Sequence, residues 1–151
     1  MKTPINIICP KHGLFSILPT RHISSKCGCK KCHESQGEKL VNSILEELQI
    51  SFIREVSILN PYNSDHNFRV DFYIEYKNQD YIIEYNGAQH YKPNKRMGGV
   101  LALKIRQQRD ADLRKYCSEN NIKLLEIKYD EKNVKEKIYH FLNVPSNQVT
   151  D

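Results

Sequence analysis

Two short pairs of metal-binding residue types near the N-terminus constrain the fold of this chain more than any other feature. Cys9 and His12 form a Cys-x-x-His pair, and after sixteen further residues Cys29 and Cys32 form a Cys-x-x-Cys pair. A gap of two residues lets both side chains of a tight turn face one ion. Four nitrogen and sulfur ligands complete the closed tetrahedral shell of a structural zinc ion. The spacing therefore predicts a small zinc-binding module over residues 1–34, of the zinc-ribbon type.

The metal is also expected to stabilise this module. A segment of about 35 residues buries too little apolar surface to fold alone, so metal binding would provide the missing free energy. Cys27 competes with Cys29 for a ligand position. Cys29 is preferred because its two-residue gap to Cys32 closes a metal-binding turn better than a one-residue gap would. The alternative is a set of reduced cysteines that bind no metal.

The net positive charge of the chain is concentrated in the same segment. Residues 1–36 contain six Lys or Arg and one acid, Glu34, whereas the remaining residues contain seventeen of each sign. Basic side chains on a small rigid module suit contact with the phosphates of a nucleic acid. A solvated charged face is the alternative interpretation. The residues expected to make this contact are Lys26, Lys30 and Lys31.

Neither a membrane span nor a signal peptide is expected. The longest apolar runs, such as Tyr81-Ile82-Ile83, are far shorter than the roughly 20 residues that cross a bilayer. The residues after Met1 contain no apolar signal core, which favours an intracellular location in the cytoplasm, or in the nucleus or cytoplasm of a host. In such a reducing compartment the five cysteines suit metal binding better than disulfides.

The rest of the chain has the pattern of a mixed α/β domain over residues 35–144, followed by a polar tail over residues 145–151. Ser35 and Glu38 form a capping box before an apolar stripe at helical spacing. Alternating apolar and polar residues predict an antiparallel hairpin with its turn at residues 78–80. The expected helices cover residues 36–48, 101–119 and 134–142, and the expected strands cover residues 52–58, 68–75, 81–85 and 123–127.

Asp71 and Glu84 each lie among apolar neighbours on the two strands of the hairpin. Burying a carboxylate is costly unless a partner compensates its charge. Two carboxylates on adjacent strands can share one cation, and hard oxygen ligands favour Mg²⁺ over zinc. The alternative is that one of them faces solvent or pairs with a base such as Arg69.

Several motifs of the chain resemble those of the PD-(D/E)XK nuclease superfamily. The likeness covers about residues 36–130. The Cys and His pairs before it resemble the zinc ribbon that precedes such domains in phage, viral and homing-type endonucleases. The resemblance implies an αβββαβ core with a central mixed sheet, preceded by a small zinc ribbon. The motifs are Glu38, Val70-Asp71-Phe72, the run from Ile83 to Tyr91, Arg109-Asp110 and the run from Lys123 to Ile127.

The resemblance also implies a catalytic site. In that superfamily the hairpin acids, here Asp71 and Glu84, bind one or two Mg²⁺ ions, and a helix glutamate, here Glu38, completes the site. A lysine two residues after the second acid helps to activate water, but this chain has Asn86 at that position. An amide carries no positive charge and cannot act as a base.

A variant of the motif offers a substitute for the lysine. The order of Glu38, Asp71, His90 and Asp110 is similar to the Glu-Asp-x-His-Asp variant of very-short-patch-repair-like and some homing nucleases, with Glu84 retained. His90 is the candidate general base or proton donor, because imidazole exchanges protons near neutral pH.

Two further residues, Gln89 and Asp110, are candidates for the site. Gln89 is a candidate for positioning water or phosphate. Asp110 lies four residues from both Arg106 and Arg114, so a surface ion-pair ladder explains it as well as catalysis does.

A second basic stretch flanks the predicted acidic site. From Lys92 to Lys115 there are eight Lys or Arg and two Asp. Cations beside a metal site would hold the phosphates of a substrate while the carboxylates hold the ions, as phosphodiester hydrolysis requires. The additional residues expected to contact nucleic acid are Lys92, Lys95, Arg96, Arg106 and Arg109.

These observations predict an endonuclease that cuts DNA with Mg²⁺ or Mn²⁺, of the homing type or the repair and recombination type, acting as a monomer or a homodimer. RNA stays open as a substrate. The alternative is a zinc-ribbon protein that binds nucleic acid through a nuclease fold that no longer cuts. Asn86 supports this second interpretation.

Overall fold

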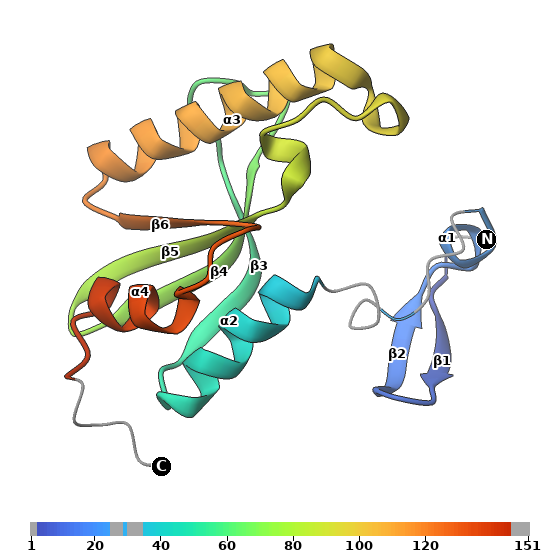
Figure 1. Ribbon diagram of the computed structural model, residues 1–151. Coiled ribbons are helices and arrows are strands. Elements are labelled where there is room, and N and C mark those ends of the chain that lie inside the picture. The colour runs from blue at the N-terminus through green and yellow to red at the C-terminus, as the bar shows by residue number, and fades with distance from the viewer. Residues whose placement is uncertain (1–2, 25–28, 30–34, 146–151) are drawn as a thin grey trace. The chain divides into compact units, whose positions relative to one another are not determined.

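The computed structural model of the protein describes residues 3–24, 29 and 35–145 (Figure 1). The chain divides into two compact units, Met1–Lys39 and Leu40–Asp151. The domain boundaries expected from sequence, after residues 34 and 144, stay predictions. The roles expected for five further residues stay predictions as well, because these residues lie outside the described ranges: Lys26, Cys27, Lys30, Lys31 and Cys32.

The first unit contains a two-stranded hairpin and a short helix. Strands β1 (Ile5–Cys9) and β2 (Gly13–Ile17) are antiparallel, and Cys9 pairs with Gly13 at the turn. Gly13 has a φ of 80°, a left-handed conformation that glycine adopts without strain. Helix α1 (Pro19–Ser24) follows, with Pro19 at its first position, where a missing N–H costs little. The sequence pattern did not predict this helix.

The second unit is a mixed α/β fold, as predicted. Its four-stranded sheet has the order β3-β4-β5-β6. Strand β4 is antiparallel to both β3 and β5, whereas β5 and β6 are parallel, so the sheet is mixed. The elements are α2 (Gln36–Glu47, entering from the first unit), β3 (Phe52–Ile58), β4 (Phe68–Tyr76), β5 (Gln79–Asn86), the 3-10 turns η2 (Ala88–His90) and η3 (Lys95–Met97), α3 (Gly99–Glu119), β6 (Lys123–Lys128) and α4 (Val134–Phe141).

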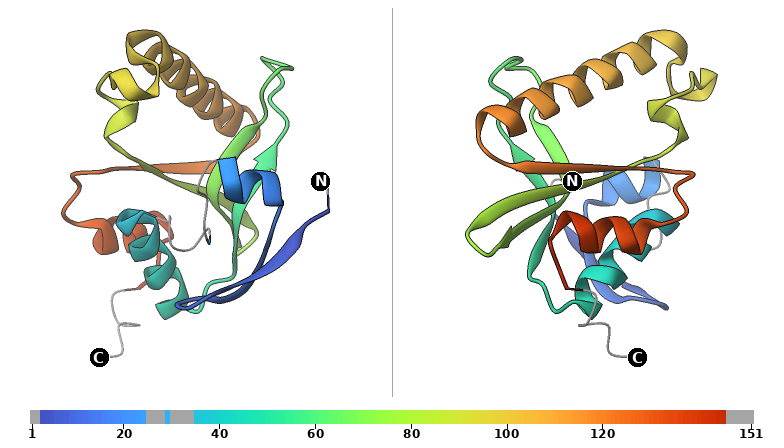
Figure 2. Two further views of the ribbon diagram at one scale, coloured as in Figure 1. Left: turned by 90° about the vertical axis from the view of Figure 1, so that its right-hand side faces the viewer. Right: turned by 60° about the vertical axis from the view of Figure 1, so that its left-hand side comes forward.

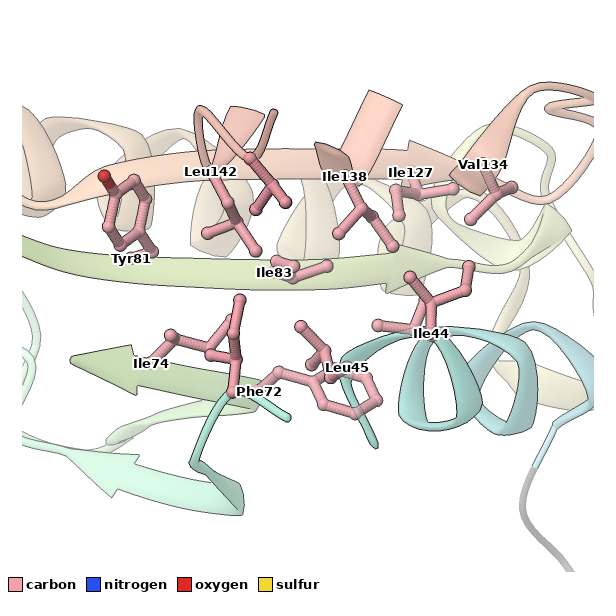
Figure 3. Close-up of a cluster of buried hydrophobic side chains, with 13 residues drawn as sticks. Ile44, Leu45, Phe72, Ile74, Tyr81, Ile83, Ile127, Val134, Ile138 and Leu142 are labelled. Atoms are coloured by element: carbon pink, nitrogen blue, oxygen red, sulfur yellow. The ribbon is translucent and has the colours of Figure 1, made fainter. Parts of the chain in front are cut away.

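The two faces of this sheet carry separate hydrophobic cores. Helices α2 and α4 cover one face, where Phe72, Ile83 and Ile138 are fully buried (Figures 1 and 3). Helix α3 covers the other face (Figure 2). On that face Leu113 and Cys117 pack on Val70 and Ile82. Among the candidate catalytic residues described below, Glu84, His90 and Asp110 lie on the α3 side of the sheet.

The central hairpin is tighter than predicted. Its turn consists of Lys77 and Asn78, which both have left-handed φ values, of 50° and 60°. Two such residues form the turn whose twist matches that of antiparallel strands. The predicted turn at residues 78–80 is therefore wrong, because Gln79 and Asp80 already pair with β4. Strand β5 also extends to Asn86, further than expected.

Across the described ranges, no helix has both the length and the apolar character needed to span a membrane.

Candidate functional site

Four of the candidate catalytic residues, Asp71, Glu84, His90 and Asp110, gather where β4 separates from β5. The backbone pairing of these strands begins at the hairpin turn and ends at the pair Phe72 and Ile83, so that Asp71, the neighbour of Phe72, is not paired with β5 through its backbone. Beyond this point the Asp71 side chain replaces the backbone pairing, because its Oδ2 accepts a hydrogen bond of 2.9 Å from the Tyr85 N–H. The strand separation therefore presents a carboxylate to β5 beside Glu84.

Strand β3 is irregular opposite Asp71. Glu55 has a φ of 53° and separates the pairs Arg54–Phe72 and Val56–Val70. Arg54 donates from Nε to the Asp71 carbonyl oxygen, at 3.3 Å. Arg69, the base considered as a partner for the hairpin acids, instead forms a 2.9 Å ion pair with Glu55. The backbone around Asp71 is therefore held by side chains from the neighbouring strand.

Glu84 and Asp71 interact directly. Burial raises the pKa of the Glu84 carboxyl well above its ordinary range, and the neighbouring Asp71 carboxylate and a hydrogen bond to it raise this pKa further. Asp110 on α3 adds to the same effect. Carboxylates placed this close in a largely buried site favour a shared proton or a bound cation. The sequence prediction that the two hairpin acids share one site agrees with this geometry.

His90 and Asp110 form the second part of the site. His90 Nδ1 lies 2.9 Å from Asp110 Oδ2, and the two side chains are 23% and 19% exposed. A carboxylate at this distance favours the tautomer with the proton on Nδ1, which leaves Nε2 as the proton acceptor. This contact joins the turn η2 to helix α3.

The ion pair of Arg114 is with Glu126 rather than Asp110, although Asp110 also acts on Arg114 electrostatically. The guanidinium of Arg114 donates from Nε and Nη2 to the two carboxylate oxygens of Glu126, at 2.7 and 3.0 Å. Asp110 instead contacts His90. The order of acids and histidine along the chain was the sequence signal for this pair, but helical spacing alone pointed to arginine.

Glu38 and Gln89 differ from the other predicted site residues. The Ser35 N–H donates to Glu38 Oε2 at 2.9 Å, and the Glu38 N–H donates to Ser35 Oγ at 3.1 Å, which confirms the predicted capping box. The Glu38 carboxylate therefore accepts a backbone hydrogen bond at the start of α2, within the first unit. The catalytic role of Glu38 stays a prediction. Gln89 lies in η2, and its side chain is outside the described part of the structure.

Asn86, at the position where the superfamily has lysine, is 3% exposed. It ends β5 and pairs in register with Lys128 of the parallel strand β6. The cationic side chain nearest to this position along the sheet register is therefore on the neighbouring strand. Sequence alignment to a motif does not reveal such a cross-strand neighbour.

The predicted phosphate contacts of the second basic stretch lie between η2 and the middle of α3. Lys92, Lys95, Arg96 and Arg109 are exposed. Arg106 is half-buried and donates to the Met97 carbonyl oxygen at 3.3 Å, so it also holds the loop before α3. Sequence reasoning missed the exposed apolar side chains of the same segment, which are Met97, Val100, Leu101 and Ile105.

Cys9, His12 and Cys29 come together in the first unit. Both sulfur atoms lie 3.6 Å from His12 Nδ1, and all three ligand atoms lie within 4.8 Å of one another. In a tetrahedral zinc site with bonds of about 2.1–2.3 Å, neighbouring ligand atoms are separated by about 3.6 Å, the distance from each sulfur to His12 Nδ1. The group can therefore hold a metal ion such as zinc, and the preferred ligand Cys29 is one of its members.

The two groups differ in how many ligands they offer. Within the described ranges, Cys9, His12 and Cys29 form the group in which three possible ligand atoms of His, Cys, Asp or Glu lie within 4.8 Å of one another. Asp71 and Glu84 offer a pair of carboxylates instead. Magnesium is commonly bound by one or two carboxylates, with water and phosphate oxygens as its other ligands.

Comparison with known proteins leaves the function open. Residues 1–33 match a family described as a protein of unknown function, DUF723. The chain is also similar to uncharacterized protein 307L of Invertebrate iridescent virus 6, with 38% identity over 66 residues. That similarity covers 40% of this chain and 31% of the viral protein, so the chain spans less than a third of its relative. No solved structure matches.

Proposed function

We propose that the protein is a metal-dependent DNA endonuclease, of the homing type or the repair and recombination type. The observation that carries the proposal is the contact pair Asp71–Glu84 beside the contact pair His90–Asp110. One pair provides oxygen ligands for a divalent cation, and the other provides a histidine oriented for proton transfer. Hydrolysis of a phosphodiester by water needs both functions.

The acids and the histidine would divide the chemistry between them. Asp71 and Glu84 would hold Mg²⁺ or Mn²⁺, which neutralises phosphate charge and makes bound water more acidic. His90 would accept a proton at Nε2 from the attacking water, or return one to the leaving sugar oxygen. The water oxygen forms a new bond to phosphorus as the bond from phosphorus to the leaving oxygen breaks.

The Cys9, His12 and Cys29 group would anchor a small module that docks on DNA. Cys32 is the proposed fourth ligand, because it completes the Cys-x-x-Cys pair. Zinc would hold the β1–β2 turn and the segment around Cys29 together. The basic residues of this segment then supply contacts with phosphate that carry no sequence preference.

Asn86 supports a second function, a nucleic-acid-binding protein with an inactive nuclease fold. Its amide is buried and supplies no positive charge to a phosphate. A binding role alone, however, gives no reason to hold the carboxyl groups of Asp71 and Glu84 against each other in a largely buried site. Cleavage is therefore the leading proposal.

The test is cleavage of supercoiled plasmid by the wild-type protein and by Asp71→Ala, with Mg²⁺ or with EDTA. Glu75→Ala is the matched control, because Glu75 is an exposed acid on the same strand. Nicked or linear products that require the metal, disappear in Asp71→Ala and persist in Glu75→Ala are expected. Absence of cleavage of supercoiled, single-stranded, mismatched and branched DNA would overturn the proposal.

A further inference from the structure

A cluster of two tyrosines and one lysine lies beyond the acids, at the C-terminal ends of β5 and β6. The Lys128 Nζ lies 4.9 Å from the ring centroid of Tyr91 and 5.8 Å from that of Tyr129. The two ring centroids are 6.1 Å apart, and the rings are tilted by 45°. We call Tyr91, Lys128 and Tyr129 the tyrosine–lysine cluster.

This cluster adjoins the candidate active site in two ways. Tyr91 directly follows His90, and the turn that holds both is closed by the Tyr91 N–H, which donates to the Ala88 carbonyl at 3.0 Å. Lys128 pairs in register with Asn86, just as Glu126 pairs with Glu84. Because side chains alternate along a strand, residues two apart share one face of the sheet.

The Glu126 side chain identifies that face. Its carboxylate receives the fork of Arg114 from α3, so Glu126 points to the α3 side of the sheet. Tyr91 also acts electrostatically on Arg114. The tyrosine–lysine cluster and the acids therefore lie along the same side of β5 and β6.

The ammonium of Lys128 is available to an anion. Its carboxylate contact is to Asp130 at 3.8 Å, too long for a hydrogen bond, and its side chain is 46% exposed. The strand register sets this lysine opposite the buried Asn86. A phosphate beside the acids would gain from the charge of this lysine, since Asn86 supplies none.

The two rings add a surface for a nucleobase. Tyr91 is 39% exposed, and Tyr129 is half-buried. The Tyr85 hydroxyl donates to the Tyr129 carbonyl oxygen at 3.1 Å, which fixes the backbone at Tyr129. Aromatic side chains beside a cation are a common platform for single-stranded nucleic acid. A base within a duplex is already stacked on both faces, so only an unpaired base can use such a ring.

We propose that the tyrosine–lysine cluster is a nucleotide subsite, in which Lys128 contacts a phosphate and Tyr91 stacks on an unpaired base next to the bond that is cut. The inference rests on the proposed function and narrows its substrate class to DNA that contains an unpaired nucleotide. A purely structural role for the cluster is the competing explanation. The experiment below separates the two.

The chain contains a matched control on the same strand. The Lys123 Nζ lies 5.7 Å from the ring of Tyr81, at the opposite end of β6. Tyr81 is only 4% exposed, so its ring offers little surface to a ligand. Lys123→Gln therefore removes a lysine–tyrosine contact from β6 without touching the proposed subsite.

Binding is measured without added Mg²⁺ or Mn²⁺, so that it does not depend on cleavage and the structural zinc is kept. Fluorescence anisotropy of the full chain with a labelled oligothymidine and with a duplex of the same length would compare the wild type with Tyr91→Ala, Tyr91→Phe, Lys128→Gln and Lys123→Gln. Tyr91→Ala should weaken oligothymidine binding by about tenfold or more and change duplex binding little, whereas Tyr91→Phe keeps the wild-type affinity. Lys128→Gln should lower the slope of log affinity against log salt by about 0.7, and Lys123→Gln should not change it.

The outcomes separate this inference from the proposed function. Wild-type protein that binds neither DNA would overturn both. Wild-type binding that Tyr91→Ala and Lys128→Gln leave intact would overturn the subsite alone, as would equal losses on oligothymidine and duplex in Tyr91→Ala. Recovery in Tyr91→Phe distinguishes loss of the ring from loss of the fold, which thermal unfolding of each variant also monitors.

Discussion

The Cys9, His12 and Cys29 group and the Asp71–Glu84 pair are both sets of metal-binding residue types, but they are built differently. The first joins the two ends of one tight hairpin turn to Cys29, which follows later in the same unit. The second joins residues of β4 and β5, and His90 and Asp110 add a turn and a helix. A structural metal site has a complete coordination shell of protein ligands, often sulfur and nitrogen. A catalytic metal site keeps coordination positions for water or substrate.

The chemistry of the ligands sharpens this contrast. Sulfur and imidazole nitrogen suit zinc, and three such ligands already lie at the spacing of a tetrahedral shell. Two carboxylates suit a harder cation that keeps water and phosphate as further ligands. The first group is therefore expected to affect mainly folding, and the second mainly activity.

Cys29→Ser should have the largest effect and should be confined to the first unit. Wild-type protein is expected to carry about one equivalent of zinc, and the variant should lose it together with the folded structure of the N-terminal hairpin. Elemental analysis and backbone amide NMR spectra would measure both changes. Cys117→Ala, which alters a buried thiol of the second unit, should keep the zinc. A folded hairpin after metal removal would contradict the contrast between the two groups.

Asp71→Asn should reduce the cleavage rate by about a thousandfold, because the loss of one metal ligand removes several kcal/mol of charge stabilisation. The unfolding temperature should not fall. The amide oxygen can still accept from the Tyr85 N–H, and the electrostatic cost of a carboxylate beside the buried Glu84 is removed. Single-turnover cleavage and thermal unfolding of the same sample would check this. A large loss of stability without loss of cleavage would give the pair a structural role.

Asp110→Asn should slow cleavage by about ten- to a hundredfold, through loss of the carboxylate that orients His90. Affinity for DNA should change little, so the effect should appear in the rate rather than in binding. Asp112→Asn on the same helix is the matched control, since Asp112 contacts Gln108 instead. Equal rates for Asp110→Asn and the wild type would remove the pair from the mechanism.

The pH dependence of stability should show the most gradual effect. Since burial and Asp71 raise the pKa of Glu84 in the folded protein, its contribution to stability is complete below the ordinary carboxyl value of 4.5 and is lost as the pH rises above it. The loss is at most about 1.4 kcal/mol per pH unit. Urea unfolding in EDTA at several pH values would measure it. Glu84→Gln should flatten this dependence, and so should added Mg²⁺ if the pair binds it.

Local patterns along the chain predicted most of the second unit. The apolar stripe after Ser35 predicted α2, and the capping hydrogen bonds between Ser35 and Glu38 are present. The alternation around Asp71 predicted β4, and the hairpin to β5 followed from the same pattern. Its turn was misplaced because Lys77 and Asn78 lack the glycine that usually marks such a turn. Helix α1 was missed because six residues show too little periodicity.

By itself, the sequence determined which chemistry this protein can hold, because residue types and short spacings encode it. It contains the Cys and His pair at one turn, the acids on the strands of one hairpin and the helix cap at Ser35. Only the tertiary structure decided which of these side chains meet. Asp110 contacts His90 while Arg114 contacts Glu126, and Lys128 lies in register with Asn86. The physical reason is that these contacts depend on how α3 and β6 pack against β5, which no local spacing along the chain specifies.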